Sequence, residues 1–366
     1  MIYKHLLRPL LFLKDPEEAH EQTLAFLSRV DFLAPILELF FSVSDSRLQV
    51  GIGPLRFPNP VGLAGGFDKN GKAIKIWPAF GFGFMEIGAV TPLAQPGNPK
   101  PRLFRLPEDE ALINRLGFNN EGADAVRGRL DAVQKNGGRP KIPLGINIGR
   151  TKVVKTEDAA ADYLFTFERL YSFGDFFTLN VSSPNTPNLR DLQEKKLLRD
   201  LLNAIQERNR ALARERGSQV KPIFVKVDPD MNFAQLDEII DVLESQQVIG
   251  IIATNATAFL REKLITRVDE PGGLSGKPLK ERATSFIRHI YQVTQGRLPI
   301  IGVGGIFTAE DAYEKIKAGA TAVQILTGFV YEGPAAVKRI NRGLLRLTEQ
   351  EGFKEVSEVV GSGAGV

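Results

Sequence analysis

The segment FFTLNVSSPNTPNLR, residues 176–190, passes from a short apolar run into a loop rich in hydroxyl, amide and proline groups. The run 176–181 has the length and composition of a buried strand, and a helical pattern follows the loop at residues 198–215. Prolines keep the loop from becoming helical, and its polar side chains offer hydrogen-bond donors and acceptors. The loop is therefore either an ordinary turn or a site that holds a small polar ring.

The same alternation of strand, loop and helix continues on both sides of this segment. Seven further strands are predicted at residues 61–63, 84–88, 144–148, 223–227, 249–253, 300–303 and 322–325. Eight such units favour an α/β fold of the (β/α)8 TIM-barrel type. A doubly wound open sheet is the alternative, because periodicity alone does not show that a sheet closes.

Three of the predicted connections are long and rich in Gly, Pro, Asn and Thr. They follow the second, fourth and sixth strands, at residues 89–120, 182–195 and 254–280. An inert connection rarely needs such length, and in a barrel the loops after the strands share one face. We expect the functional site on that face.

The first 45 residues differ from the rest of the chain. Asp15 and Pro16 are typical of a helix start, and apolar positions three and four residues apart at 32–41 predict a second amphipathic helix. The sequence thus predicts a helical extension at residues 1–45 and a barrel domain at residues 46–366. The extension either packs against the barrel or lies on an anionic membrane surface.

Composition excludes several classes of function. The chain has no cysteine and three histidines, so thiolate chemistry, iron–sulfur ligation and His-based triads are not expected, and no metal site is predicted. A net charge of +4 without clustered Lys and Arg argues against nucleic-acid binding. No apolar run reaches the roughly 20 residues that span a bilayer, and no secretory signal is expected.

Glycines and lysines mark further candidate positions. The turn at residues 302–305, GVGG, and the sequence Leu326-Thr327 follow the last two strands, where barrels commonly bind phosphate. Lys226 lies in an apolar strand, and Lys69 follows the first strand. Each lysine either faces an anionic or electron-rich ligand or forms a salt bridge with a neighbouring aspartate, Asp68 or Asp228.

Asparagines recur where the predicted strands end. They are Asn114, Asn147, Asn180, Asn185 and Asn255. Each alone is more typical of a turn, but as a set at one rim they offer donors and acceptors to a planar ring. We therefore expect a pyrimidine-like or amide-like substrate.

Several of these motifs resemble, in order, those of the dihydroorotate dehydrogenase family, with spacing similar to the class 2, quinone-dependent form. They are residues 63–71, 95–98, 114–120, 180–190, 254–255, 272–276 and 302–305. The resemblance implies one FMN per chain and the oxidation of (S)-dihydroorotate to orotate in de novo pyrimidine (UMP) biosynthesis, with a quinone as final electron acceptor. It also implies that the extension is a membrane-facing quinone entrance, at the cytoplasmic face of the cell membrane. We expect a monomer.

The resemblance also implies site residues. Ser183 aligns with the catalytic base that removes a proton from C5 of dihydroorotate while C6 gives hydride to the flavin, and Lys226 would face the pyrimidine edge of FMN. The implied substrate contacts are Lys69, Asn114, Arg115, Leu116, Gly117, Phe118, Asn180, Asn185, Asn255 and Ala256. The implied FMN contacts are Gly65, Gly66, Phe67, Asp68, Lys69, Ala89, Asn147, Asn180, Lys226, Thr254, Gly276, Gly305, Leu326 and Thr327. Because an unaided serine is a poor base, we expect help from a water chain and the asparagines.

Four positions depart from the pattern of the family. Gly65 stands where alanine is usual, Ala89 where threonine is usual, Ala256 where a hydroxyl residue is common, and Asp228 where a small apolar residue is usual. Two rival functions stay open. One is a class 1-like soluble dehydrogenase that passes electrons to fumarate or through a partner to NAD. The other is a catalytically silent flavin or phosphate binder.

Overall fold

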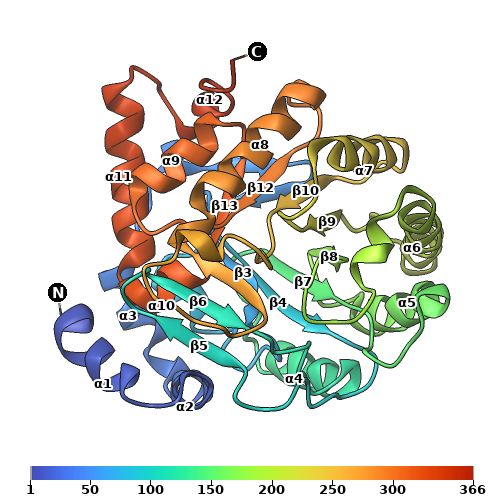
Figure 1. Cartoon of the computed structure of the whole chain (residues 1–366), viewed down its shortest axis with the longest axis horizontal. Coiled ribbons are helices and arrows are strands. Elements are labelled where there is room, and N and C mark those ends of the chain that lie inside the picture. Colours follow the sequence, from blue (N-terminus) through green and yellow to red (C-terminus); the bar gives the residue numbers. More distant parts are fainter. Residues whose placement is uncertain (1, 366) are drawn as a thin grey trace.

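A closed barrel of eight parallel strands forms the centre of the computed structural model, which describes residues 2–365 (Figure 1). The strands are β3 (Val61–Asp68), β4 (Phe84–Val90), β7 (Leu144–Ile148), β8 (Phe176–Asn180), β9 (Ile223–Val227), β10 (Gly250–Ala253), β12 (Ile300–Val303) and β13 (Ala322–Ile325). They pair in chain order, and β13 returns to pair with β3. The eight predicted strands are confirmed, and the alternative of an open doubly wound sheet is wrong.

Helices surround the barrel, as Figure 1 shows. They are α4 (Ala123–Lys135), α5 (Ala159–Leu170), α6 (Lys195–Arg216), α7 (Phe233–Ser245), α8 (Lys280–Thr294), α9 (Ala309–Lys317), α10 (Thr327–Glu332), α11 (Ala336–Gln350) and α12 (Val356–Val359). Helix α9 begins directly after Thr308, because Thr308 and Asp311 cap each other's backbone N–H groups. Covered by helices outside and filled inside, the strands are buried on both faces.

Aromatic rings close the amino end of the barrel. Phe84, Phe176 and Phe224 are fully buried, and each lies over a glycine of a neighbouring strand. A Cβ at Gly145, for example, would come within 2.2 Å of the Phe176 ring. The hairpin of β1 (Val50–Ile52) and β2 (Leu55–Phe57) adds Phe57, whose ring stacks on Phe84 at 4.3 Å. With this end filled, the carboxyl end of the barrel is left for ligands.

A second sheet covers part of the carboxyl end. Strands β5 (Leu103–Leu106), β6 (Ala111–Asn114) and β11 (Gly273–Gly276) pair antiparallel in the order β11-β6-β5. The sequence predicted only long loops here, because these strands are short and β6 pairs with a segment far along the chain. The sheet places Asn114 opposite Gly273 at the rim.

The N-terminal extension forms α1 (Arg8–Phe12), α2 (Pro16–Arg29) and α3 (Ala34–Phe41). Helix α2 begins as predicted, because the carboxylate of Asp15 accepts the N–H groups of Glu17 and Glu18 at 2.9 and 3.0 Å. Ala19 of α2 is buried, whereas Phe26 of the same helix is 61% exposed. The extension therefore packs one face on the barrel and leaves an apolar face uncovered. The uncovered residues include Leu6, Leu10, Leu13, Phe32, Ile36, Leu39 and Phe40.

A buried ion pair fastens the extension to the barrel. Arg102 donates to both carboxylate oxygens of Glu17, at 2.6 and 2.9 Å, and also to the carbonyls of Pro96 and Asn98. Burial disfavours the charge of Glu17, but the hydrogen bonds and charge of Arg102 outweigh it and hold the pKa of Glu17 below its ordinary value. Within residues 2–365, no helix combines the length and apolar character that a membrane span needs.

Candidate active site

Three asparagines meet at the carboxyl end of the barrel. Asn180, the last residue of β8, donates through Nδ2 to Oδ1 of Asn147 on β7 at 3.2 Å. Asn255, just after β10, donates through Nδ2 to Oδ1 of Asn180 at 3.3 Å and to Oγ of Ser182 at 2.9 Å. The predicted clustering at one rim is confirmed, because parallel strands deliver their end residues to the same edge.

A carboxylate below this rim was missed by the sequence analysis. Glu86 on β4 is fully buried and accepts hydrogen bonds from Asn147 (2.7 Å), Thr178 (2.9 Å) and Gln324 (3.1 Å). A single acidic residue within the otherwise apolar strand β4 was the signal in the sequence that could have indicated a buried carboxylate. Its three hydrogen-bond donors could not be predicted, because only closure of the barrel brings them together. Glu86 therefore fixes the amide orientation of Asn147 and, through it, that of Asn180.

Lys226 reaches the same interior from β9. In the barrel register it lies beside Asn180 on one side and Ile252 on the other, and it is 5% exposed. Burial lowers the pKa of Lys226, and the charge of Glu86 opposes that shift. No residue in the described part of the chain hydrogen-bonds to its ammonium group. The salt bridge to Asp228 considered from sequence does not form, and the buried cation is left available to a ligand.

Two adjacent serines follow β8, and they differ in how their hydroxyls are used. Ser182 donates to Oδ1 of Asn180 at 3.2 Å and accepts from Asn255. Ser183 accepts only the backbone N–H of Asn185, at 3.3 Å, and its own hydroxyl donates to no group within residues 2–365. The Ser183 proton is therefore free to interact with a ligand or water.

A second amide pair lies on the other side of Ser183. Asn185 donates through Nδ2 to Oδ1 of Asn114 at 3.2 Å. Strand β6 of the second sheet therefore contacts the loop that carries Ser182 and Ser183 (residues 182–193, the serine loop). Asn98 donates to the carbonyl of Asn185 at 3.3 Å and to that of Arg115 at 2.9 Å. Gly117 has a φ of +69°, and a Cβ there would approach the Asn98 amide to 2.8 Å. The motif at residues 114–118 thus needs glycine to close over this rim.

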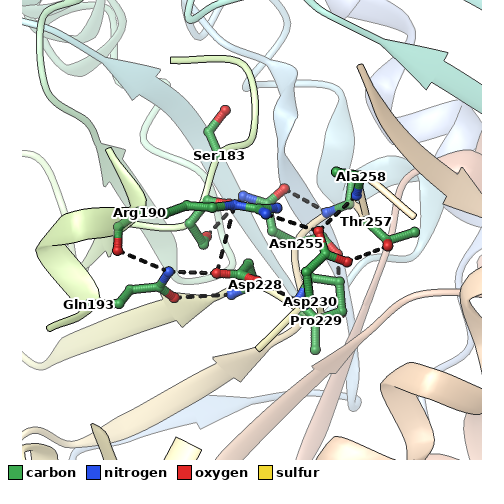
Figure 2. A network of polar contacts seen from close by, with 12 residues as sticks. Ser183, Arg190, Gln193, Asp228, Pro229, Asp230, Asn255, Thr257 and Ala258 are labelled. Carbon is green, nitrogen blue, oxygen red and sulfur yellow. Dashed lines mark hydrogen bonds and ion pairs between the residues drawn. The ribbon is translucent and has the colours of Figure 1, made fainter. Parts of the chain in front are cut away.

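Polar contacts also hold the far end of the serine loop, as Figure 2 shows. Arg190 lies 2.9 Å from Asp230 and 3.7 Å from Asp228, and its Nε donates to the carbonyl of Ser182 at 3.3 Å. Gln193 donates to the Asp228 carboxylate at 2.5 Å and accepts the N–H of Asp228 at 3.2 Å. Asp228, which departs from the family pattern, is therefore bound to the loop that carries Ser183.

Glycines shape the rim near β12 and β13. Gly304 and Gly305 have φ of +122° and +69°, and a Cβ on Gly305 would come within 2.5 Å of Lys280. Gly276 has a φ of +101°, and a Cβ there would come within 2.4 Å of the carbonyl oxygen of Glu110 and 3.0 Å of the Thr327 side chain. Three backbone segments thus approach one another where any side chain would obstruct them. This geometry fits a phosphate group held by backbone N–H groups.

Some predicted contact residues use their side chains elsewhere. Asp68 accepts the N–H groups of Lys72 and Ala73 and the indole N–H of Trp77, so it stabilises a turn and does not pair with Lys69. Arg115 forms an ion pair with Glu270 at 2.6 Å. For Asp68 and Arg115, the predicted ligand contacts would involve main-chain atoms.

The structure accounts for one of the small-residue departures. A Cβ on Gly65 would lie 2.2 Å from Oε1 of Glu86, so glycine leaves room for this carboxylate to bond with Asn147. Ala256 is buried and packs closely on Gly273, since a Cβ added to Gly273 would lie 2.8 Å from the Cβ of Ala256. Nothing in the structure explains Ala89.

These features define a (β/α)8-barrel enzyme whose site combines a rim of amides, an unpaired buried lysine and a glycine-lined cradle. The model of the family described as dihydroorotate dehydrogenase matches residues 47–347. The chain therefore belongs to the dihydroorotate dehydrogenase family, and it is an oxidoreductase.

Relatives of this chain carry a more specific name. It is 48% identical to the dihydroorotate dehydrogenase (quinone) of Gloeobacter violaceus, over 97% of this chain and 98% of the relative, and 49% identical to that of Nostoc punctiforme, over 98% of each. Among solved structures, dihydroorotate dehydrogenase from Eimeria tenella in complex with ferulenol superposes with a TM-score of 0.87 at 37% identity, covering 96% of each chain. The ligand-free Eimeria structure gives a TM-score of 0.86 at 38% identity, covering 95% of this chain and 99% of that chain.

Proposed function

We propose that this protein oxidises (S)-dihydroorotate to orotate in pyrimidine biosynthesis, with FMN as the resident cofactor and a quinone as final electron acceptor. The observation that carries the proposal is the hydrogen-bonded rim of Asn147, Asn180 and Asn255, with the buried Lys226 next to Asn180 in the barrel register. A ring with alternating carbonyl and N–H groups matches these donors and acceptors.

The donor set fits FMN. The cradle of Gly276, Gly304 and Gly305 would hold its phosphate, and Lys226 would lie at the pyrimidine edge of the ring system. Bound there, FMN would accept a hydride from C6 of dihydroorotate. The charge of Lys226 would then stabilise the negative charge that the ring gains on reduction.

The substrate would lie between this ring system and the serine loop. Asn114, Asn185 and Asn255 would orient its carbonyl and N–H groups, and Lys69 would bind its carboxylate. Ser183 would take the proton from C5 while its own hydroxyl proton passes to a water, which is open to it because this hydroxyl donates to no group among the described residues. Thr186, three residues on, has a buried hydroxyl without a partner among the described residues, so it can bind a water that assists proton removal.

Polar and aromatic groups between the extension and the barrel support a quinone route. His20 of α2 hydrogen-bonds to the carbonyl of Phe67 at 2.8 Å, and burial lowers its pKa to about 4. The ring of Phe12 lies 5.4 Å from that of Tyr331 and 4.6 Å from the guanidinium of Arg105. The apolar outer face of the extension suits a membrane surface, from which a quinone could reach these groups.

The charge of Lys69 predicts how ligand binding depends on pH. Burial lowers its pKa to about 8, although the charge of Glu17 opposes the shift. Only the protonated ammonium attracts a carboxylate, so orotate affinity should be constant below pH 8 and fall by up to about tenfold per pH unit above it. Orotate titrations of the oxidised holoenzyme between about pH 6 and 9.5 measure this. Lys69→Gln should bind weakly without the inflection, and an unchanged inflection would show that another group titrates.

The reaction is tested by anaerobic mixing of the purified holoenzyme with dihydroorotate, followed by a short-chain quinone or, separately, by fumarate. We expect the flavin absorbance to bleach and then to recover with the quinone but not with fumarate. Recovery of the absorbance with fumarate would instead support the alternative function, a class 1-like soluble dehydrogenase. An absorbance that never bleaches would support the silent binder.

A further inference from the structure

The carboxylate cluster beside Ser183 has no part in the chemistry proposed above. Asp228 and Asp230 follow β9 directly, and their side chains are 5% and 6% exposed. Both face Arg190 of the serine loop, so two buried acids share one guanidinium (Figure 2). Burial of this much charge is costly unless every partner is held in place, which makes the cluster a rigid link.

The two acids reach different segments. Asp230 accepts the hydroxyl of Thr257 and, at 2.8 Å, the N–H of Ala258, both in the loop after β10. Asp228 binds Gln193 in both directions, through its carboxylate at 2.5 Å and its N–H at 3.2 Å. The N–H of Asp230 closes the cluster on the Asp228 carboxylate at 2.8 Å. The loops after β8, β9 and β10 are therefore fastened together at one point.

We propose that Asp228 is a positioning residue: through Gln193 and Arg190 it fixes the segment 182–193, so that Ser183 is held over the substrate. This inference rests on the proposed function. Arg190 transmits the constraint, because its Nε donates to the carbonyl of Ser182, the residue next to Ser183. The family pattern that the sequence resembles has a small apolar residue at this position, and such a residue could not form this link.

Proton transfer depends steeply on alignment, and a small displacement of a reacting group lowers the rate strongly. We expect Asp228→Ala to slow flavin reduction by saturating dihydroorotate by about tenfold or more. Reoxidation by quinone should stay within about twofold, because it does not use Ser183. Orotate affinity should change less than the reduction rate, since Asn114, Asn255 and Lys69 lie outside the segment.

A second measurement reports the constraint without catalysis. Hydrogen exchange of peptides within residues 182–193 of the holoenzyme should be faster in Asp228→Ala than in wild type. Asp228→Asn should be intermediate, because its amide oxygen can still accept from Gln193 but no longer attracts Arg190. Asp241→Asn is the matched control, since Asp241 pairs with Lys195 just beyond the same loop at the surface, at 3.7 Å. It should match wild type in every measurement.

Gln193→Ala approaches the same link from the loop side and should reproduce both effects. Combined with Asp228→Ala, it should add little further loss, because the two residues act as one unit. Wild-type exchange and wild-type reduction rates in both single variants would overturn the proposal, as would equal losses of reduction rate, FMN content and orotate affinity. If wild type itself is not reduced by dihydroorotate, the proposed function fails, and the exchange measurement still decides whether Asp228 holds the loop.

Discussion

Replacement of Ser183 by alanine should lower the rate of flavin reduction by dihydroorotate by about 10²- to 10⁴-fold, the range that a positioned general base contributes. The amount of bound FMN should be unchanged, because the only hydrogen bond of the Ser183 side chain within the described structure is to the N–H of Asn185. Anaerobic stopped-flow absorbance measures the reduction, and the FMN content of the purified variant gives the second quantity.

Ser182→Ala is the natural comparison. The Ser182 hydroxyl is already engaged with Asn180 and Asn255, and losing one such hydrogen bond costs about 1 kcal/mol, or roughly two- to tenfold in rate. An equal fall in both variants would remove Ser183 from its proposed role. Ser183→Cys should retain part of the activity and gain a pH dependence, since a thiol titrates near pH 8.5 whereas a serine hydroxyl does not.

Replacement of Lys226 by methionine should slow flavin reduction by about 10²- to 10³-fold, because the reduced ring would lose the cation proposed to stabilise the charge at its pyrimidine edge. The midpoint potential of the bound flavin should fall as well. Lys221→Met is a matched control, because Lys221 lies two residues before the other end of the same strand. That variant should reduce at the wild-type rate.

A double variant separates two explanations of this loss. Lys226→Met leaves the buried carboxylate of Glu86 without its counter-charge, which by itself could distort the rim of asparagines. Glu86→Gln in the same chain removes the stranded charge and keeps an oxygen and an N–H for hydrogen bonding. If Lys226 acts on the flavin, the double variant stays slow; recovery of the rate would show that the lysine serves only to neutralise Glu86.

The asparagine rim and the serine loop could be predicted because their residues stand next to strand ends in the sequence. A parallel barrel brings every such position to one face, so Asn147, Asn180 and Asn255 needed no further information to be grouped. The engagement of Asp68 and Arg115 with Trp77 and Glu270 could not be predicted in this way. The partner of a polar side chain often lies far away in the chain, and the sequence does not show which of several possible partners the fold brings close.

Sequence alone determined the alternation of strands and helices, the start of α2 at Asp15 and the capping of α9 at Thr308, because these depend on contacts within a few residues. Only the tertiary structure decided that the sheet closes, that β6 pairs with β11 across the rim, and that Glu86 lies within bonding distance of Asn147 and Gln324. The tertiary structure also decided the hydrogen bond of Asp228 with Gln193 and its ion pair with Arg190. Hydrophobic periodicity records which faces are buried, whereas pairing of buried polar groups is set by the three-dimensional register of strands far apart in the chain.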